Sequence, residues 1–463
     1  MKIREKFFGN KQFYSRVVAL ALPIVIQNGI TNFVNLLDNI MVGSLGTEQM
    51  SGVSIVNQFI FIFNLLIYGA ISGAGIFCVQ YHGTNNPNGV QQTFRFKLYS
   101  NILLSSISIG LFAAFGGDLI STFLFESGTG GDLALTLSQG REYLQIMLIG
   151  LVPYAISQVY ASTLRETEHT VVPMVASVVA VFVNFILNYI LIFGNLGFSP
   201  LGVKGAAIAT VISRFAELLI LLVWSHRHTD KCIYFKGVFK SFAIPSVLVK
   251  RMIVKALPLM TNELLWSISL TLRNQCYATR GIDAVAAQNI CSTIFNVFSV
   301  IYMAFGTVIS IMVGNLLGQG RFEEARDTNR KVLVCSVFCG ITLGTLLVLS
   351  SGIFPQLYNT DENVKSIAAY MMIISGIYMP FYAFSNSSYF TIRSGGSVGI
   401  TFLMDSGFMC LFMLPVSVVV SRFTDVSIFV LFAICQGAET LKAFVGFIMI
   451  QKTRWTKRLV GDQ

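Results

Sequence analysis

Charged side chains are scarce in this chain of 463 residues, at 12% of the total, where a soluble domain carries roughly 25%. Apolar residues fill the deficit: 54% of the chain is hydrophobic, and 39 residues are phenylalanine. Uncharged runs such as 171–193 and 332–350 extend for about twenty residues, enough to cross a hydrocarbon core of ~30 Å as a helix. These runs exclude a large soluble protein and predict an all-α integral membrane protein.

Signals for enzyme chemistry are missing as well. The eight cysteines contain no Cys-x-x-Cys pair, so neither a disulfide framework nor a zinc site is indicated. The stretch 197–204 lacks the spacing of a phosphate-binding loop, and the four histidines fall in predicted loops without ligand-spaced partners in the membrane. We therefore expect a protein that is not an enzyme and that holds no cofactor.

Apolar segments long enough to span a bilayer occur twelve times by our reading of the sequence. We predict spans at 14–43, 51–80, 95–116, 142–162, 171–193, 204–225, 251–279, 284–316, 331–351, 364–390, 398–420 and 427–450. Prolines 23 and 153 of the first half and 258 and 380 of the second lie inside spans, where proline removes a backbone donor and bends a helix. A structural kink is the favoured interpretation of each.

Basic residues gather on one side of these twelve spans. That side holds the N-terminus, the loop that contains Arg95 and Lys97, the segment 227–255, the loop after residue 316 and the C-terminal tail. The positive-inside rule then predicts a cell-membrane protein with both termini in the cytoplasm. Topology and attraction to anionic lipid also account for the net charge of +10, so no nucleic-acid partner is expected.

The two halves of the chain repeat one another at an offset of about 235 residues. Ala-Leu-Pro at 21–23 returns at 256–258, and glycine 46 and phenylalanine 63 return at 281 and 298. Six spans in each half place both copies in the same orientation, as in parallel repeats. We predict two pseudo-symmetric six-helix lobes, 1–226 and 251–463, joined by a cytoplasmic linker at 227–250. Such a duplicated bundle is typical of a secondary transporter.

Ionisable residues inside the spans are few, and each costs roughly 2.5–3.5 kcal/mol near a helix centre. They are Asp38, Arg214, Glu217, Glu263, Arg273, Asp405, Glu439 and Lys442. Arg214 with Glu217, and Glu439 with Lys442, are spaced so that each pair can satisfy itself along its own helix. Asp38, Glu263 and Asp405 have no such local basic partner.

Helix direction places Asp38 at the same depth as Asn184, Asn188 and Thr210, in the outer half of the first lobe. One carboxylate, two amides and a hydroxyl can form an oxygen-rich pocket that suits a small hard cation. The same pocket could let Asp38 exchange a proton. The alternative is a polar cluster that only holds three helices together.

Glu263 and Asp405 lie in the inner half of the second lobe by the same reasoning. Acidic groups there, beside Asn262, Trp266, Tyr378 and Tyr382, would suit an organic cation in a substrate cavity. A lobe-internal bridge from either carboxylate to Arg273 or Arg393 is the competing interpretation.

At these residues the sequence resembles the multidrug and toxic compound extrusion (MATE) transporters. The segment ALPIVIQNGITNFVNLLDNIMVGSLGTEQMSGVS is similar to the first-helix signature of that family, and NFILNYILIFGNLGFSPLGVKGAAIATVISR to its fifth and sixth helices. The second copy, with ALPLMTNELLWSISL and GNLLGQGRFEEARD, resembles the seventh helix and the loop after the eighth. The resemblance implies a first-lobe cation site at Asp38, Asn184 and Thr210, which would hold Na+ if that is the ion. A further site position, an aspartate in some branches, is Asn188 here.

The resemblance implies twelve helices in two lobes, the MATE fold, with alternating access. It implies a multidrug efflux antiporter that exports organic, often cationic, compounds in exchange for H+ or Na+; the expected partners are a small-molecule drug and the bilayer, and we expect a monomer. A flippase for a lipid-linked metabolite is the alternative from the same superfamily. A major-facilitator antiporter is disfavoured, because 82–97 lacks the expected Asp-Arg-rich motif, and a membrane enzyme would need a catalytic constellation.

Overall fold

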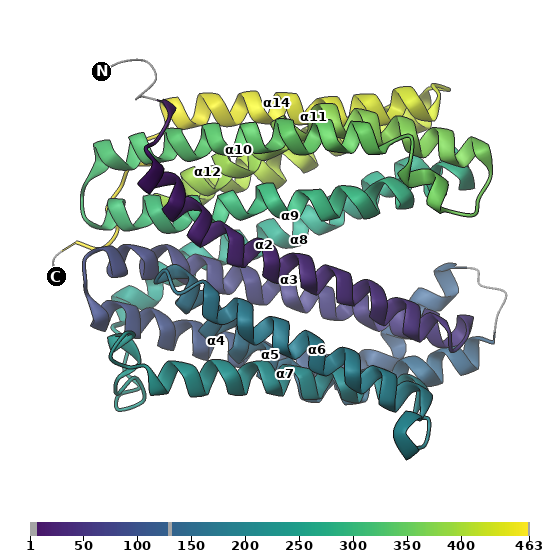
Figure 1. The fold of residues 1–463 in the computed structure, drawn as a ribbon, viewed down its shortest axis with the longest axis horizontal. Helices are drawn as coiled ribbons and strands as arrows, with labels where there is room; N and C mark the ends of the chain where they lie inside the picture. Colours follow the sequence, from purple (N-terminus) through teal and green to yellow (C-terminus); the bar gives the residue numbers. More distant parts are fainter. Residues whose placement is uncertain (1–6, 128–131, 462–463) are drawn as a thin grey trace. The chain divides into compact units, whose positions relative to one another are not determined.

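The computed structural model describes residues 7–127 and 132–461, and the regular elements of this part of the chain are all helical (Figure 1). Long helices follow one another with short connections: α2 (Lys11–Gly43), α3 (Thr47–Gly83), α4 (Pro87–Ser127), α5 (Leu133–Glu166), α6 (Val171–Phe193), α7 (Gly202–Arg227), α8 (Ser246–Ala278), α9 (Ile282–Gly318), α10 (Phe322–Ser350), α11 (Glu362–Ser394), α12 (Val398–Phe402), α13 (Leu414–Phe423) and α14 (Ile428–Lys452). Counting 398–423 as one span, these make the twelve long helices that the sequence predicts.

Eleven of these spans, within the described residues, are long and apolar enough to cross a membrane. The twelfth predicted span, α8, falls below that level because Asn262, Glu263 and Arg273 interrupt its apolar run. Polar residues inside a membrane helix are rare and commonly functional. The low mean hydropathy of α8 is therefore a sign of polar residues that could serve a function.

Several helices extend well beyond the apolar runs that mark them in the sequence. The predicted span 95–116 is the middle of α4, which begins eight residues earlier, at Pro87. The assignment of Arg95 and Lys97 to a loop is therefore wrong, since both lie inside a helix. Lys97 is fully buried and forms an ion pair with Glu166 at the end of α5, and Arg95 donates to the carbonyl of Val238 at 2.8 Å. A hydropathy window detects the hydrocarbon-crossing part of a helix and not its polar extension.

Two compact units make up the chain, one of residues 26–78 and 86–260 and the other of 1–25, 79–85 and 261–463. In the first, α5 packs against α4 and α7, and α6 packs against α7. Its apolar core includes Val56 and Phe59 of α3 and Met147 of α5. In the second, α11 packs against α9, α10 and α14, around a core that includes Met371, Met379 and Phe432.

The segment that follows α7 belongs to the first of these units. It is not an extended tether: Tyr234, Phe235 and Val238 are buried, and the ring of Phe235 stacks on that of Tyr160 with centroids 5.3 Å apart. The pKa of the Tyr234 hydroxyl is raised by burial, and this hydroxyl lies 2.6 Å from that of Thr167. Aromatic packing and hydrogen bonds therefore fix the predicted linker against α5.

The predicted span 398–420 is interrupted in the structure. The prolines at 23, 153, 258 and 380 lie inside continuous helices, whereas two π-helical turns, Leu403–Gly407 and Met409–Met413, separate α12 from α13. Pro415 follows directly. Proline has no N–H to donate to the carbonyl four residues earlier, and its ring crowds that carbonyl, which disfavours regular α-helix at this point. Turns of π-helix are rare, and those that occur are frequently at functional sites.

Candidate ion and substrate sites

Asp38 of α2 forms a cluster with three side chains from α6 and α7 in the first unit. Asn188 of α6 donates from Nδ2 to Asp38 Oδ1 at 2.6 Å. The orientation of the Asn184 amide that satisfies its hydrogen bonds puts its nitrogen 3.0 and 2.9 Å from the two carboxylate oxygens of Asp38. Thr210 of α7 lies 3.3 Å from the other end of the same amide. The structure thus brings together all four residues that depth alone had grouped.

Close packing of α6 on α7 holds this cluster. A Cβ at Gly205 would lie 2.6 Å from the carbonyl of Leu191, so only glycine allows the two backbones to approach so closely. Ala206 and Ala207 continue the small surface, and α6 ends at Gly194, whose φ of +73° is the left-handed conformation that glycine adopts without strain. This contact sets Thr210 beside Asn184.

Burial gives the cluster its electrostatic character. Asn184 and Asn188 are 5% and 1% exposed, whereas Asp38 is only half-buried. Asn188 Oδ1 is buried without a hydrogen-bond partner among the described residues. A buried oxygen without a donor is uncommon, and an amide oxygen in this position can be a ligand for a hard cation.

A second polar cluster lies in the other unit, around Asp405 in the first π-helical turn. Lys442 of α14 pairs with Asp405, Nζ to Oδ1, at 2.6 Å, and Asn262 of α8 donates to Asp405 Oδ2 at 2.9 Å. Asn262 also accepts from the backbone N–H of Ser406 at 3.2 Å, while the Ser406 hydroxyl donates to the carbonyl of Asn262 at 2.6 Å. The irregular turn is thereby joined to α8 and α14.

These contacts correct two expectations about ion pairs. Lys442 pairs with Asp405 rather than with Glu439 on its own helix, so Asp405 is not without a basic partner. Arg214 lies 4.8 Å above the ring of Tyr154 and 3.4 Å from the carbonyl of Gly150, rather than in an ion pair with Glu217. Arg214 and Lys442 thus both contact another segment of the chain, and residue spacing along a single helix cannot predict such contacts.

The aromatic residues predicted for the substrate cavity lie at different places around this second cluster. Trp266 packs against Met409, Met413 and Ala438 beside the π-turns. Tyr382 donates to Gln436, and its ring meets that of Phe295 edge to face at 5.4 Å. The Tyr378 hydroxyl faces Gly437 of α14. All three therefore adjoin α14 or the π-turns.

Three ionisable groups of this unit remain without a full set of partners among the described residues. Glu263 is half-buried and forms no ion pair there; the charges of Asp405 and Arg393 act on it. Glu439 is 3% exposed and leaves Oε2 without a hydrogen-bond partner, as does Nε of Arg273. No pattern in the sequence singles out Ser406 or Gln436, which bond to Asn262 and Tyr382. Pro415, shortly after the π-turns, is a feature of the sequence that could have indicated an irregular helix here.

Twelve long spans, eleven of them apolar enough to cross a membrane within the described residues, and a polar cluster in each compact unit are the features of an integral membrane transporter. The chain belongs to the MatE family, whose pattern matches residues 23–190 and 258–419 and so covers both copies of the repeat. Members of this family are transporters, and the protein is accordingly not an enzyme.

Relatives and solved structures agree on this fold. A protein of Thermotoga maritima named as a probable multidrug resistance protein NorM is 23% identical over 397 residues, 82% of this chain and 80% of the relative. Bacillus subtilis YoeA, also named as a probable multidrug resistance protein, is 22% identical and is covered to 87% of its length, with 88% of this chain matched. A variant of the Vibrio cholerae MATE transporter VcmN superposes with a TM-score of 0.85 at 16% identity, over 96% of this chain and 98% of that one. A transporter of the MOP superfamily from Pyrococcus furiosus gives 0.82 at 18%, over 98% and 99%.

Proposed function

We propose that the protein is a secondary active multidrug exporter that exchanges amphipathic organic cations for H+ or Na+ by alternating access. The relatives named as multidrug resistance proteins and the family membership support drug efflux. The basic residues at one end of the spans support a cell-membrane location with both termini in the cytoplasm. The cation-exchange part of the proposal rests on the cluster around Asp38.

Asp38 is suited to bind and release a small cation because its partners can change roles. Two amide nitrogens now face the carboxylate and stabilise its charge. A half-turn of either amide would present an oxygen instead, since an amide carries a donor and an acceptor at equal reach. The unpartnered Asn188 Oδ1 is the observation that best supports this role, because a bound cation would satisfy it. A proton on Asp38 would serve the same exchange, with the carboxyl group then donating to an amide oxygen.

Organic cations would bind in the second unit. Glu263 offers a half-buried negative charge without an ion-pair partner among the described residues, and Trp266 on the same helix offers a ring face. Asp405 and Asn262, by contrast, are already bonded to Lys442, Ser406 and each other. We therefore assign the substrate-facing charge to Glu263 and a positioning role to Asp405.

Reconstituted vesicles test the proposal. The protein is loaded into liposomes with a fluorescent organic cation, and a Na+ or pH jump is applied across the membrane. Ion-driven movement of the dye is expected for the natural protein and for Asp118→Asn, which removes an exposed carboxylate of α4. Asp38→Asn keeps the shape of the side chain but removes its charge, and it is expected to abolish the ion dependence at equal protein content.

Two outcomes would count against the proposal. Undiminished ion-driven transport by the Asp38→Asn protein would separate Asp38 from coupling. Movement of fluorescent lipid between leaflets, with no response of the dye to either ion jump, would favour the flippase.

A further inference from the structure

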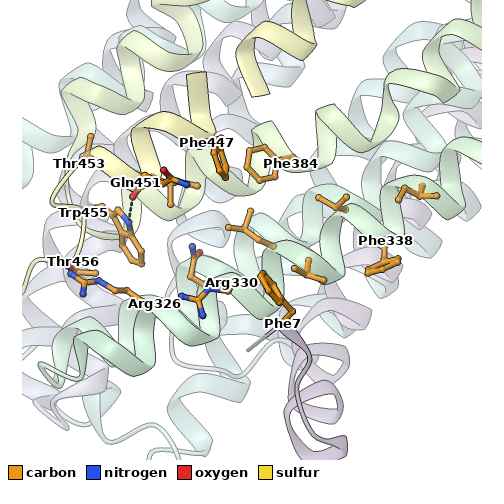
Figure 2. Close-up of a pocket in the computed structure, with 16 residues that line it drawn as sticks. Phe7, Arg326, Arg330, Phe338, Phe384, Phe447, Gln451, Thr453, Trp455 and Thr456 are labelled. Atoms are coloured by element: carbon orange, nitrogen blue, oxygen red, sulfur yellow. Dashed lines mark hydrogen bonds between the residues drawn. The ribbon is translucent and has the colours of Figure 1, made fainter. Parts of the chain in front are cut away.

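A groove in the second unit is formed by α10 and α14, which both pack on α11. Its volume is about 830 Å³. Arg326 and Arg330 of α10 lie at one end with Trp455 and Thr456 of the C-terminal segment, whereas Phe384 of α11, Phe447 of α14 and Phe338 of α10 lie toward the other end (Figure 2). The groove is therefore cationic at one end and apolar along the rest of its length.

The cationic end is equipped to bind a phosphate. The lining contains two arginines and neither aspartate nor glutamate. Arg326 already pairs with Glu323 at 2.7 Å, outside the lining. Arg330 forms no hydrogen bond within the described residues: the carboxylate of Asp327 lies 4.0 Å from it and is bound by Lys331 at 2.5 Å. Arg330 is therefore the arginine with donors to spare, and Arg326 adds charge beside it. Arginine presents several N–H donors in a planar fork that matches phosphate oxygens.

The apolar part of the groove is comparable in length to the hydrocarbon of one leaflet. Apolar residues of α10 line it from Leu333 to Ile341, ~12 Å at 1.5 Å per residue, and the whole lining of α10 from Arg326 to Ile341 extends over ~22 Å. Half of a bilayer's hydrocarbon core measures ~15 Å. Phe338, Ile341 and Phe447 are 55%, 47% and 49% exposed in spans that cross the membrane, where the surrounding solvent is lipid.

We propose that this groove binds an anionic phospholipid of the cytoplasmic leaflet, with its phosphate at Arg330 and Arg326 and one acyl chain along α10. The leaflet follows from the proposed orientation of the chain; the site itself does not depend on the transported substrate. A zwitterionic choline headgroup places a second cation beside two guanidinium groups, so the groove favours lipids with net negative charge.

The site is already formed before a lipid arrives. Arg326 donates to the Thr456 hydroxyl at 3.2 Å, and Trp455 donates from Nε1 to the carbonyl of Ile450 at 3.1 Å. Gln80 fixes the following residues by accepting from the N–H of Leu459 at 2.7 Å and donating to the carbonyl of Lys457 at 3.3 Å. A site that needs little reordering loses less affinity on binding. A bound lipid would in turn hold the C-terminal segment against α10.

Trp455 provides a probe inside the groove, since the chain has only three tryptophans. In a variant with Trp224→Phe and Trp266→Phe, the fluorescence of Trp455 is titrated with brominated phosphatidylglycerol or brominated phosphatidylcholine, whose chains quench nearby indoles. Phosphatidylglycerol is expected to reach half-maximal quenching at a mole fraction about tenfold lower than phosphatidylcholine, as a charge-assisted hydrogen bond allows.

Substitutions in the same protein distinguish a specific lipid-binding site from general contact with the bilayer. Arg330→Gln should remove most of the preference for phosphatidylglycerol. Arg321→Gln, which removes an exposed arginine that pairs with Glu324 outside the groove, should retain it. Val337→Phe narrows the groove without changing its charge and should weaken quenching by both lipids. Equal quenching by the two lipids, or a preference that survives both Arg330→Gln and Val337→Phe, would overturn the proposal. The assay involves no transport, so its result is independent of the exchange mechanism.

Discussion

The ion pair between Lys442 and Asp405 shows how strongly a buried charge depends on its partner. The two side chains are 10% and 15% exposed, and both project from spans that cross the membrane. Neither charge could remain there alone, because removing one partner leaves the other uncompensated in a medium of low polarity. Asn262 adds a second bond to the carboxylate from α8, so the pair joins three segments of the chain.

Breaking this pair from one side should therefore destabilise the protein more than removing it entirely. We expect Lys442→Gln to lower the stability of the purified protein by about 3 kcal/mol or more, and the double variant with Asp405→Asn to recover most of that loss. Thermal unfolding in detergent measures both, with Lys452→Gln at the exposed end of α14 as the control. Additive effects of the two single changes would show that the pair contributes no coupling.

The contrast between the two clusters shows which side-chain contacts could be predicted from the sequence and which could not. Asp38 and Asn188 were grouped because regular helices convert residue number into depth, and α2, α6 and α7 are regular at these positions. Asp405 lies in a π-turn, where the extra residue per turn rotates the following side chains by an amount that hydropathy does not record. Lys442 was therefore paired with Glu439 on its own helix instead of with Asp405.

At the level of elements, the contact of α6 with α7 depends on one missing side chain. Gly205→Ala would place a methyl group against the carbonyl of Leu191, and the helices must separate to admit it. We expect a loss of about 1–3 kcal/mol, the usual range for overpacking. Because Thr210 is carried on the same helix, the stabilisation of the protein by Na+ or by low pH should also weaken.

Gly110→Ala is the matched control for this change. A Cβ at Gly110, in the middle of α4, meets nothing within 4 Å. The substitution should leave thermal stability unchanged or raise it slightly, because alanine favours helix over glycine by about 1 kcal/mol. Equal effects of the two alanines would mean that the approach of α6 to α7 does not hold the cluster in place.

For the molecule as a whole, the repeat predicted the number of helices and the class of protein but not the chemistry of the second copy. Both copies begin with Ala-Leu-Pro, yet Asp38 of the first has no acidic counterpart 235 residues later, where residue 273 is arginine. Duplication preserves packing, since each copy must bury the same faces, and leaves polar positions free to diverge. The two units thus carry different charges on a similar frame, which suits a division of work between ion and substrate.

This division predicts unequal effects of two neighbouring carboxylates. Glu263 has no ion-pair partner among the described residues, so Glu263→Gln should change which organic cations are exported, or their apparent affinity, while the Na+ or pH dependence is retained. Asp405 is held by Lys442 and Asn262, so Asp405→Asn should lower stability and reduce the export of all compounds alike. Resistance profiles across several cations of different size and charge, normalised to protein content, distinguish the two patterns. A uniform loss in the Glu263→Gln strain would assign that carboxylate to helix packing, and an altered ion dependence would place it in the coupling step instead.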